Sequence, residues 1–244
     1  MIKAEKLVKR FGRFTAVDGV SFRVSSGQIV GLLGANGAGK STTMRLLTGY
    51  LSADQGTARV GGFDITANRD AAQRLIGYLP ESAGGFPQIT VREFLAFAGE
   101  ARNIWGAELR DAIDRVSEMV DLNSALHRRM SELSKGWRQR AWFAQALLHD
   151  PSALILDEPT DGLDPNQKDR ARALIRDAAK DKAIILSTHI LEEAEELCDR
   201  VIVIDHGRVV RDLPCQDLLD ERGRLAPAFR QLTGGSAERP GGNP

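Results

Sequence analysis

Cysteine is scarce in this sequence, which has only Cys198 and Cys215 among its 244 residues. Two cysteines cannot build a disulfide framework for a chain of this size, so a reduced, cytosolic setting fits the composition best. No apolar run approaches the roughly 20 residues of a membrane-spanning helix, and the first ten residues lack the apolar core of a signal peptide. Any role at a membrane is therefore expected to depend on a partner protein.

The chain also lacks an excess of charge of either sign, because 33 Lys and Arg residues balance 33 Asp and Glu residues. Nucleic-acid-binding domains usually carry a strongly basic surface, so the composition gives no support for a nucleic-acid partner. The length is sufficient for one large domain or two small ones with a buried core. Function must therefore be inferred from local motifs.

The most informative motif is residues 34–41, Gly-Ala-Asn-Gly-Ala-Gly-Lys-Ser, which match the phosphate-binding pattern G-x-x-x-x-G-K-[ST]. We call it the phosphate loop. The pattern predicts an apolar strand at 28–33 and a helix at 40–51 around it. Glycines let successive N–H groups face one anion, and the helix N-terminus adds its positive dipole. This context disfavours the alternative, a glycine-rich turn that binds nothing.

Each residue of this loop has an expected contact with a nucleotide. Lys40 is predicted to reach the β- and γ-phosphates, and the Ser41 hydroxyl to bind Mg²⁺. The predicted phosphate-binding set is Gly34, Ala35, Asn36, Gly37, Ala38, Gly39, Lys40, Ser41 and Thr42.

A second motif places two carboxylates at the end of a buried strand. Residues 153–159 read Ala-Leu-Ile-Leu-Asp-Glu-Pro, an apolar run followed by Asp157 and Glu158. In open parallel sheets, ligands bind at the carboxyl ends of the strands. We expect Asp157 to hold Mg²⁺, mostly through water, and Glu158 to orient or deprotonate an attacking water. The alternative is a pair of surface carboxylates that ends a strand, which the upstream phosphate loop disfavours.

The pattern of the whole chain predicts an α/β core with a helical insertion. Short β-type runs with glycine turns occupy the first 33 residues and recur around 57–60. The texture is helical from about 82 to 133, where Thr90 and Glu93 form a capping box before an apolar helical face.

The second half of the chain alternates helices with short apolar strands. A helix is predicted at 136–149, and the strands at 153–156 and 183–187 resemble buried parallel strands with a helix at about 165–180 between them. Residues 201–204 and 208–213 predict a hairpin. From 233 onward the Gly- and Pro-rich sequence predicts a disordered tail.

Six landmarks occur in the order seen in the ATP-binding subunits of ABC transporters, and the resemblance covers roughly residues 1–215. The landmarks are Phe11, at the place of an aromatic residue that stacks on adenine; the phosphate loop; Gly-Tyr-Leu-Pro-Glu at 77–81, the Q-loop; Leu-Ser-Lys-Gly-Trp at 133–137, the signature segment; Leu-Asp-Glu-Pro-Thr-Asp-Gly-Leu-Asp at 156–164, the second carboxylate motif with the D-loop; and Ser-Thr-His at 187–189, the switch. Together they are too specific to arise by chance.

The resemblance implies a fold and a domain organisation. The expected fold is an α/β P-loop NTPase (RecA-like) core with an N-terminal antiparallel β-subdomain and an inserted α-helical subdomain. The ATP-binding domain would span residues 1–225, with the helical subdomain inserted at about 82–133. Residues 226–244 would form a C-terminal extension.

The resemblance also implies roles for residues outside the phosphate loop. His189 would sense the γ-phosphate, although its spacing alone suggests an ordinary histidine at a strand end. Val17 would flank the adenine and ribose beside Phe11. Ser134 and Gly136 would contact the γ-phosphate of a nucleotide held by an opposing subunit. Asp164 would belong to the D-loop and mainly cap the helix that begins at Pro165.

Two positions depart from the usual family pattern. Glu81 stands where the family usually has glutamine, and an ionised carboxylate in contact with a triphosphate would be repelled by about 4 kcal/mol per unit charge at an intermediate dielectric. We therefore expect Mg²⁺ or water between Glu81 and the nucleotide, which makes Glu81 a predicted nucleotide and metal contact. The signature segment has Lys135 and Trp137 in place of the common glycine and glutamine. We expect Lys135 to be solvated and Trp137 to serve packing.

The implied function is hydrolysis of ATP to ADP and phosphate, with ATP and Mg²⁺ bound between two head-to-tail subunits, most simply a homodimer. The subunit would drive a separately encoded membrane permease from the cytoplasmic face of the membrane. The sequence around 133–151 is similar to exporter-type ATPases of gliding motility, copper-enzyme maturation and drug or polysaccharide export.

The alternative that the sequence leaves open is a regulatory ABC ATPase that signals through a membrane partner without transport. DNA-repair members of the superfamily carry very long insertions, and its translation factors carry two cassettes, so neither class fits this chain.

Overall fold

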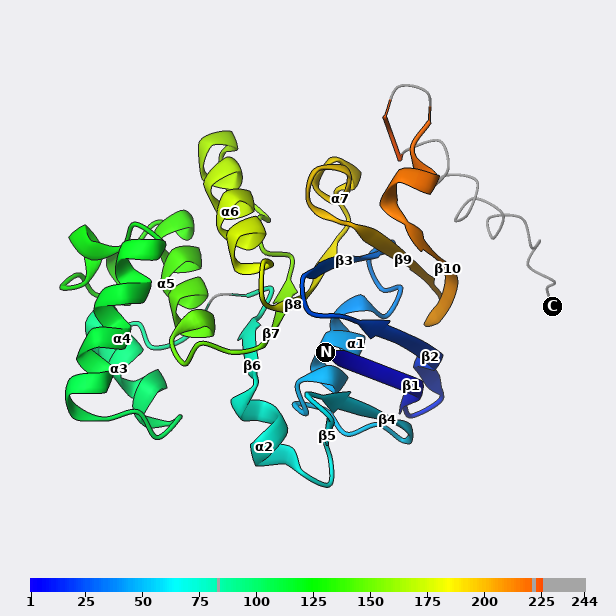
Figure 1. The fold of residues 1–244 in the computed structure, drawn as a ribbon, viewed down its shortest axis with the longest axis horizontal. Coiled ribbons are helices and arrows are strands. Elements are labelled where there is room, and N and C mark those ends of the chain that lie inside the picture. Colours follow the sequence, from blue (N-terminus) through cyan, green and yellow to red (C-terminus); the bar gives the residue numbers. More distant parts are fainter. Residues whose placement is uncertain (83, 221–222, 226–244) are drawn as a thin grey trace, which may run out of the picture.

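The computed structural model describes residues 1–82, 84–220 and 223–225. Two β-sheets lie together on one side of the molecule, and a group of helices forms a separate lobe on the other (Figure 1). The predicted tail from 233 onward lies outside the described residues. Within them, no helix is both long and apolar enough to cross a lipid bilayer.

The first sheet is antiparallel and is built from the N-terminal part of the chain. Its strands β1 (Ile2–Phe11), β2 (Phe14–Val24), β4 (Gln55–Val60) and β5 (Phe63–Asp64) lie in the order β2-β1-β4-β5. Side chains in β2 alternate, so that Val20, Phe22 and Val24 are buried while the residues between them are exposed. The predicted antiparallel β-subdomain is confirmed.

The second sheet has six strands and forms the core of the molecule. Its order is β10-β9-β3-β8-β7-β6, and all neighbours are parallel except β9 and β10, which form the predicted hairpin. The strands are β3 (Gln28–Leu33), β6 (Ile76–Leu79), β7 (Ala153–Asp157), β8 (Ala183–Thr188), β9 (Arg200–Asp205) and β10 (Arg208–Pro214). Every residue of β7 and β8 is buried, as their apolar runs predict.

The helices cover this sheet and form the lateral lobe. They are α1 (Lys40–Leu47), α2 (Arg69–Arg74), α3 (Val91–Glu100), α4 (Gly106–Met119), α5 (Lys135–Leu147), α6 (Pro165–Ala178) and α7 (Leu191–Leu197), with short 3₁₀ turns at Asn123–Ala125, Met130–Glu132 and Cys215–Leu218. The capping box is confirmed, since the Glu93 N–H donates to Thr90 Oγ1 at 3.2 Å and the Thr90 N–H donates to Glu93 Oε2 at 2.7 Å.

The lobe contains α3, α4 and α5, which pack on one another (Figure 1). Helix α5 begins after the predicted insertion of 82–133, and it also packs against β6. It therefore joins the lobe to the edge of the central sheet, and it carries the signature segment at its N-terminal end.

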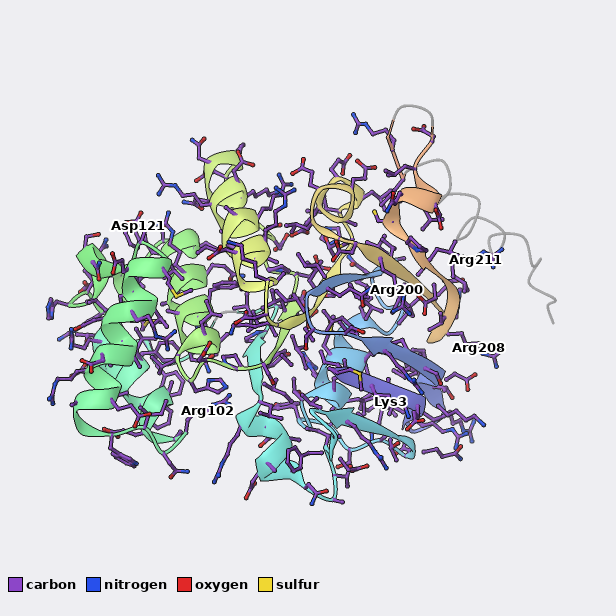
Figure 2. All side chains as sticks on the ribbon, in the orientation of Figure 1. Lys3, Arg102, Asp121, Arg200, Arg208 and Arg211 are labelled. Carbon is purple, nitrogen blue, oxygen red and sulfur yellow. The ribbon has the colours of Figure 1, made fainter. Side chains whose placement is uncertain are left out.

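Arginine side chains tie the antiparallel sheet to the central one. Arg200, labelled in Figure 2, lies on β9. It donates to both carboxylate oxygens of Asp212, at 2.5 Å each, and to the Arg23 carbonyl oxygen on β2 at 2.7 Å. Arg208 Nε donates to Asp18 Oδ2 at 2.8 Å. These bonds hold β2 beside β9 and β10, which places the β1–β2 hairpin next to the loop that follows β3.

Gly77 in β6 permits the close approach of α5, and the sequence pattern did not identify this strand. A Cβ atom at Gly77 would lie 2.6 Å from Leu154 Cδ2 and 2.9 Å from Pro151 Cγ, and closer still to the Ala146 carbonyl oxygen. A side chain here can fit only if β6 or the end of α5 moves.

We therefore expect Gly77→Ala to lower the free energy of unfolding by about 1–3 kcal/mol, as overpacking of a core does. Urea denaturation followed by circular dichroism measures the change. Gly84→Ala is the matched control, because a Cβ at Gly84 meets no atom within 4 Å. Equal stability of the two variants would contradict the close packing of β6 and α5.

Candidate active site

The phosphate loop lies between the end of β3 and the start of α1, as the sequence predicts. Gly39 is the N-cap of α1 with φ of 107°, a conformation that favours glycine. A Cβ at Gly39 would also collide with the Ala16 carbonyl oxygen of β2. The loop can therefore turn into the helix only with glycine at this position, and Lys40 becomes the first helical residue.

An open cavity of about 320 Å³ lies over this loop. It brings together residues from the β1–β2 hairpin, the phosphate loop and the carboxyl ends of β6 and β7. The lining residues are Phe11, Phe14, Ala16, Asn36, Gly37, Gly39, Lys40, Ser41, Thr42, Glu81 and Glu158. Most of the predicted phosphate-binding residues thus face one space, whereas Gly34, Ala35 and Ala38 do not line it.

Lys40 is held in place by the loop that precedes it. Its Nζ donates to the carbonyl oxygens of Gly34 at 2.8 Å and Ala35 at 3.2 Å, and it lies 3.9 Å from Glu158 Oε1. Burial lowers the pKa of Lys40, although the nearby carboxylates of Glu158 and Asp157 act in the opposite direction. Lys40 thus brings a buried ammonium group to the lining of the cavity, which suits the site to an anion.

Asp157 and Ser41 form a pair of oxygen donors suited to a divalent cation. Ser41 Oγ donates to Asp157 Oδ1 at 3.1 Å, and Ser187 Oγ donates to the same oxygen at 2.5 Å. The second oxygen, Asp157 Oδ2, is buried and has no hydrogen-bond partner among the described residues. A hydroxyl beside a carboxylate with a spare buried oxygen fits Mg²⁺, which takes oxygen ligands and retains several waters.

Glu158 has a strained backbone and lies between two basic groups. Its φ is 50°, which is uncommon for a residue with a side chain, and its N–H donates to Ser187 O at 3.2 Å and Ser187 Oγ at 3.1 Å. Its carboxylate lies 2.8 Å from His189 Nδ1. Burial raises the pKa of Glu158, although His189 and Lys40 act against this. A carboxylate of raised pKa is suited to general-base chemistry.

The β1–β2 hairpin supplies the apolar side of the cavity. Phe11 pairs with Phe14 across the hairpin, and their side chains are 48% and 61% exposed. Flat aromatic faces of this kind can stack on a nucleotide base. Phe14 was missed in the sequence, where two aromatics flanking Gly12 and Arg13 were the available signal. The side chain of Val17 is fully buried in the core, and Ala16 lines the cavity instead.

The signature segment and the D-loop lie outside this cavity. Ser134 is the N-cap of α5, and Gly136 is buried against Gln167 of α6, whose Cδ would lie 2.6 Å from a Cβ at Gly136. Asp164 caps α6 as predicted and accepts from the Gln167 N–H at 2.9 Å. None of Ser134, Gly136 and Asp164 lines the space above the phosphate loop.

The two unusual residues of the signature segment have contacts within the chain. Lys135 is exposed, as expected, and its Nζ pairs with Asp161 Oδ2 at 3.0 Å. Trp137 packs against the core of the lobe, with the Arg140 guanidinium 4.8 Å from its ring centroid. Both residues therefore have partners within the chain.

The strand, glycine loop and helix form one part of the site. Strand β7 of the same sheet lies beyond β8, ends at Asp157 and is followed by Glu158. This combination defines a P-loop nucleotide-binding fold. The protein-family model described as "ABC transporter" matches residues 17–161. The chain belongs to the ABC transporter family. It is the ATP-binding domain of that family, an ABC-type ATPase.

Curated relatives with substantial identity are named as ATP-binding proteins. The "Nod factor export ATP-binding protein I" of Paraburkholderia xenovorans (strain LB400) is 41% identical over 215 residues, which cover 86% of this chain and 70% of that protein. The "Uncharacterized ABC transporter ATP-binding protein YxlF" of Bacillus subtilis (strain 168) is 39% identical over 209 residues, covering 86% and 69%.

Solved structures share the fold. The "Structure of ATP binding subunit of ABC transporter" aligns with a TM-score of 0.86 at 28% identity, covering 95% of this chain and 99% of that one. An ATP-binding cassette described as a dimeric post-hydrolysis state bound to ADP and Pi aligns with a TM-score of 0.80 at 22% identity, covering 88% and 98%. At that identity the second likeness concerns the fold alone.

The raised pKa of Glu158 predicts a pH-dependent effect of Glu158→Gln on stability. The folded state binds the Glu158 carboxyl proton more tightly than the unfolded chain does, so protonated Glu158 contributes to folding stability. This contribution is complete below the ordinary pKa of 4.5 and is lost as the pH rises through the pKa of Glu158 in the folded state. The Glu158→Gln variant has no carboxyl group to ionise at this position, so its stability does not show this decrease with pH. We expect its melting temperature without nucleotide to exceed that of the wild type at pH 7.5, and the difference to shrink toward pH 4.

Differential scanning fluorimetry across this pH range measures the effect. Glu118→Gln, at an exposed position on α4, is the control and should follow the wild type at every pH. A difference for Glu158→Gln that stays constant with pH would contradict the assigned direction of the pKa shift.

Proposed function

We propose that this chain binds ATP with Mg²⁺ over its phosphate loop, pairs head-to-tail with a second copy, and hydrolyses ATP to drive a separately encoded membrane permease as an exporter. The observation that carries the proposal is an incomplete site. The cavity holds the phosphate loop and Glu158, whereas the signature residues Ser134 and Gly136 of the same chain do not line it. A second copy would supply them.

Within one subunit, we expect the predicted site residues to have the following roles. Ser41 and Asp157 would hold Mg²⁺, with Glu81 at the cavity edge interacting through water, and the metal would neutralise charge on the phosphates. Lys40 would turn from the loop carbonyls toward the β- and γ-phosphates. Glu158 would accept the proton of the attacking water, and His189 would donate to the γ-phosphate.

Across the dimer, α5 would present its N-terminal end to the partner's nucleotide. The Ser134 hydroxyl, the Gly136 backbone and the positive end of this 13-residue helix would face the γ-phosphate. ATP would then act as a bridge between subunits, and hydrolysis would remove contacts that hold them together. A dimeric cassette among the solved structures with this fold supports the arrangement.

Glu158→Gln is expected to retain ATP binding, to lower turnover by about 10²–10⁴-fold, and to accumulate as an ATP-bound dimer, because the base is lost while the bridging contacts remain. Phosphate release and light scattering after gel filtration with Mg²⁺ and ATP measure both effects. Lys40→Ala is the control that should lose nucleotide affinity. Wild-type turnover in Glu158→Gln would refute the assignment of Glu158 as the general base.

In the same assays, Ser134→Arg tests the role of Ser134 across the dimer separately from ATP binding by a single subunit. It should abolish hydrolysis and dimerisation while the monomer still binds ATP, because Ser134 lies outside the subunit's own cavity. Loss of ATP binding by the monomer would contradict a role across the dimer.

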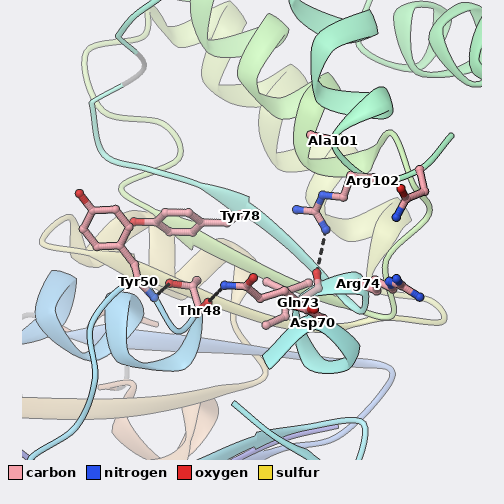
Figure 3. A pocket seen from close by; sticks show the side chains of 10 residues that line it. Thr48, Tyr50, Asp70, Gln73, Arg74, Tyr78, Ala101 and Arg102 are labelled. Atoms are coloured by element: carbon pink, nitrogen blue, oxygen red, sulfur yellow. Dashed lines mark hydrogen bonds between the residues drawn. The ribbon is translucent and has the colours of Figure 1, made fainter. Parts of the chain in front are cut away.

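The helical insertion, with α5, is the proposed contact for the permease. Phe86 and Phe97 lie with ring centroids 5.4 Å apart, and both side chains are exposed. A second cavity, of about 470 Å³, opens where α1, α2 and the end of α3 meet, and Tyr50 and Tyr78 border it (Figure 3). Exposed aromatic side chains are enriched at protein interfaces.

A chain of hydrogen bonds at this cavity links the phosphate-loop helix to the lobe. Gln73 Nε2 on α2 donates to the Thr48 carbonyl oxygen at the end of α1, at 2.9 Å. Arg102 Nη1, just beyond α3, donates to the Gln73 carbonyl oxygen at 2.7 Å (Figure 3). These bonds support transmission of the nucleotide state to a partner on the lobe. Export is supported by the names of the relatives, and the cytoplasmic face of the membrane is the proposed location.

Phe97→Asp is expected to reduce membrane association of the chain several-fold in cells that contain its permease, with ATP hydrolysis by the isolated subunit unchanged, because a charge disrupts an apolar contact. Quantitative immunoblotting of membrane fractions measures it. Phe63→Asp, at another exposed phenylalanine on β5, is the matched control. Equal loss in both variants would contradict docking on the lobe. ATP-driven transport in vesicles with the copurified permease would exclude the regulatory alternative.

A further inference from the structure

A buried carboxylate outside the catalytic set joins the two segments that carry Glu158 and His189. Glu193 on α7 is 1% exposed. Thr160 Oγ1 donates to its Oε1 at 2.6 Å, and Thr188 Oγ1 donates to its Oε2 at 2.5 Å. Each carboxylate oxygen thus accepts one hydroxyl, and both threonines are themselves buried.

The two threonines belong to the segments that emerge from β7 and β8. Thr160 follows Glu158 by two residues, and Thr188 directly precedes His189. The ladder between the strands ends at the pair Asp157 and Ser187, so Glu158 and His189 lie beyond its last pair. Glu193 bonds these segments to each other beyond the point where the sheet ends.

The cost of burying a carboxylate makes the two hydrogen bonds between Glu193 and the threonines costly to break. An ionised carboxyl group in the interior is strongly unfavourable unless hydrogen bonds satisfy it. No lysine, arginine or histidine of the described residues forms a salt bridge with Glu193, so the threonine hydroxyls and the first turn of α7 supply its stabilisation. If either threonine moved away, one carboxylate oxygen would lose its partner.

Each threonine is also anchored to the backbone around the site. Thr188 Oγ1 accepts from the Ile190 N–H at 3.0 Å, which sets the turn containing His189. The Thr160 carbonyl oxygen accepts from the Leu163 N–H at 3.3 Å, within the D-loop that leads to Asp164. A shift at Glu193 would therefore move the His189 turn relative to the segment of Glu158.

We propose that Glu193 is a positioning residue for ATP hydrolysis, which holds Thr160 and Thr188 together and so fixes the separation of Glu158 and His189. The inference rests on the proposed roles of that pair. It predicts that turnover depends more on the reach of the side chain at 193 than on its charge, which adds to the raised pKa of Glu158 after burial. The 2.8 Å contact between His189 Nδ1 and Glu158 Oε2 is the geometry it would maintain.

The test compares Glu193→Asp with Glu193→Gln in the full chain. Aspartate keeps the charge but is one methylene shorter, so it cannot reach both hydroxyls. Glutamine keeps the length, and it can bond both hydroxyls because a threonine hydroxyl accepts as well as donates. We expect kcat to fall about 10- to 100-fold for aspartate, as for other misplaced catalytic groups, with KM and affinity for ATP unchanged. Glutamine should restore most of the turnover.

Glu192→Asp is the matched control, because Glu192 is the exposed neighbour on the same helix and should retain wild-type turnover. Wild-type kcat in Glu193→Asp, an equal loss in Glu193→Gln, or a loss of ATP affinity in place of kcat would each overturn the proposal. If Glu193→Asp does not fold, Thr160→Val and Thr188→Val test the same bonds singly and should lower kcat at unchanged ATP affinity. Wild-type values in both would overturn it.

Glu158→Gln separates failure of this inference from failure of the proposed function. If that variant retains turnover, the assigned base is wrong, whatever Glu193 does. If Glu158→Gln is inactive while Glu193→Asp is fully active, the assignment of Glu158 as the base is supported and the positioning role of Glu193 is refuted.

Discussion

The site depends on one buried carboxylate oxygen, Asp157 Oδ1, which accepts the hydroxyls of both Ser41 and Ser187. These bonds join the phosphate-loop helix, the end of β7 and the end of β8 at one point. Because burial of a charged group is costly without hydrogen bonds, both hydroxyls are held where the carboxylate needs them. Ser187 also accepts the Glu158 N–H, so the strained backbone that aims Glu158 into the cavity depends on the same cluster.

The architecture connects this cluster to distant surfaces through short, rigid contacts. Helix α5 packs on both β6 and the other two helices of the lobe, and its first turn carries the signature segment. On the other side, the bonds from Arg102 through Gln73 to Thr48 link the lobe to the end of α1. These contacts are the route by which the proposed function would transmit a change at the phosphate loop to the lobe.

Local sequence patterns predicted the parts of this site that are contiguous in the chain. The phosphate loop, the capping box at Thr90 and the helix cap at Asp164 depend on neighbours within a few residues. Strand β6 was missed because Gly77 interrupts its apolar pattern, although glycine is required there by the approach of α5. Phe14 was missed because the two residues between it and Phe11 were not recognised as a hairpin turn, which pairs the two aromatic residues.

The sequence by itself determined the strand, loop and helix around Lys40, the carboxylates after β7, and membership in a family of nucleotide-binding domains, since each depends on residue types at fixed short spacings. Only the tertiary structure decided which hydroxyls meet which carboxylates. Thr160, Thr188 and Glu193 meet because β7 and β8 are adjacent and α7 folds back over them, and no local spacing encodes that adjacency. Burial then makes each of these bonds obligatory, which a sequence pattern cannot express.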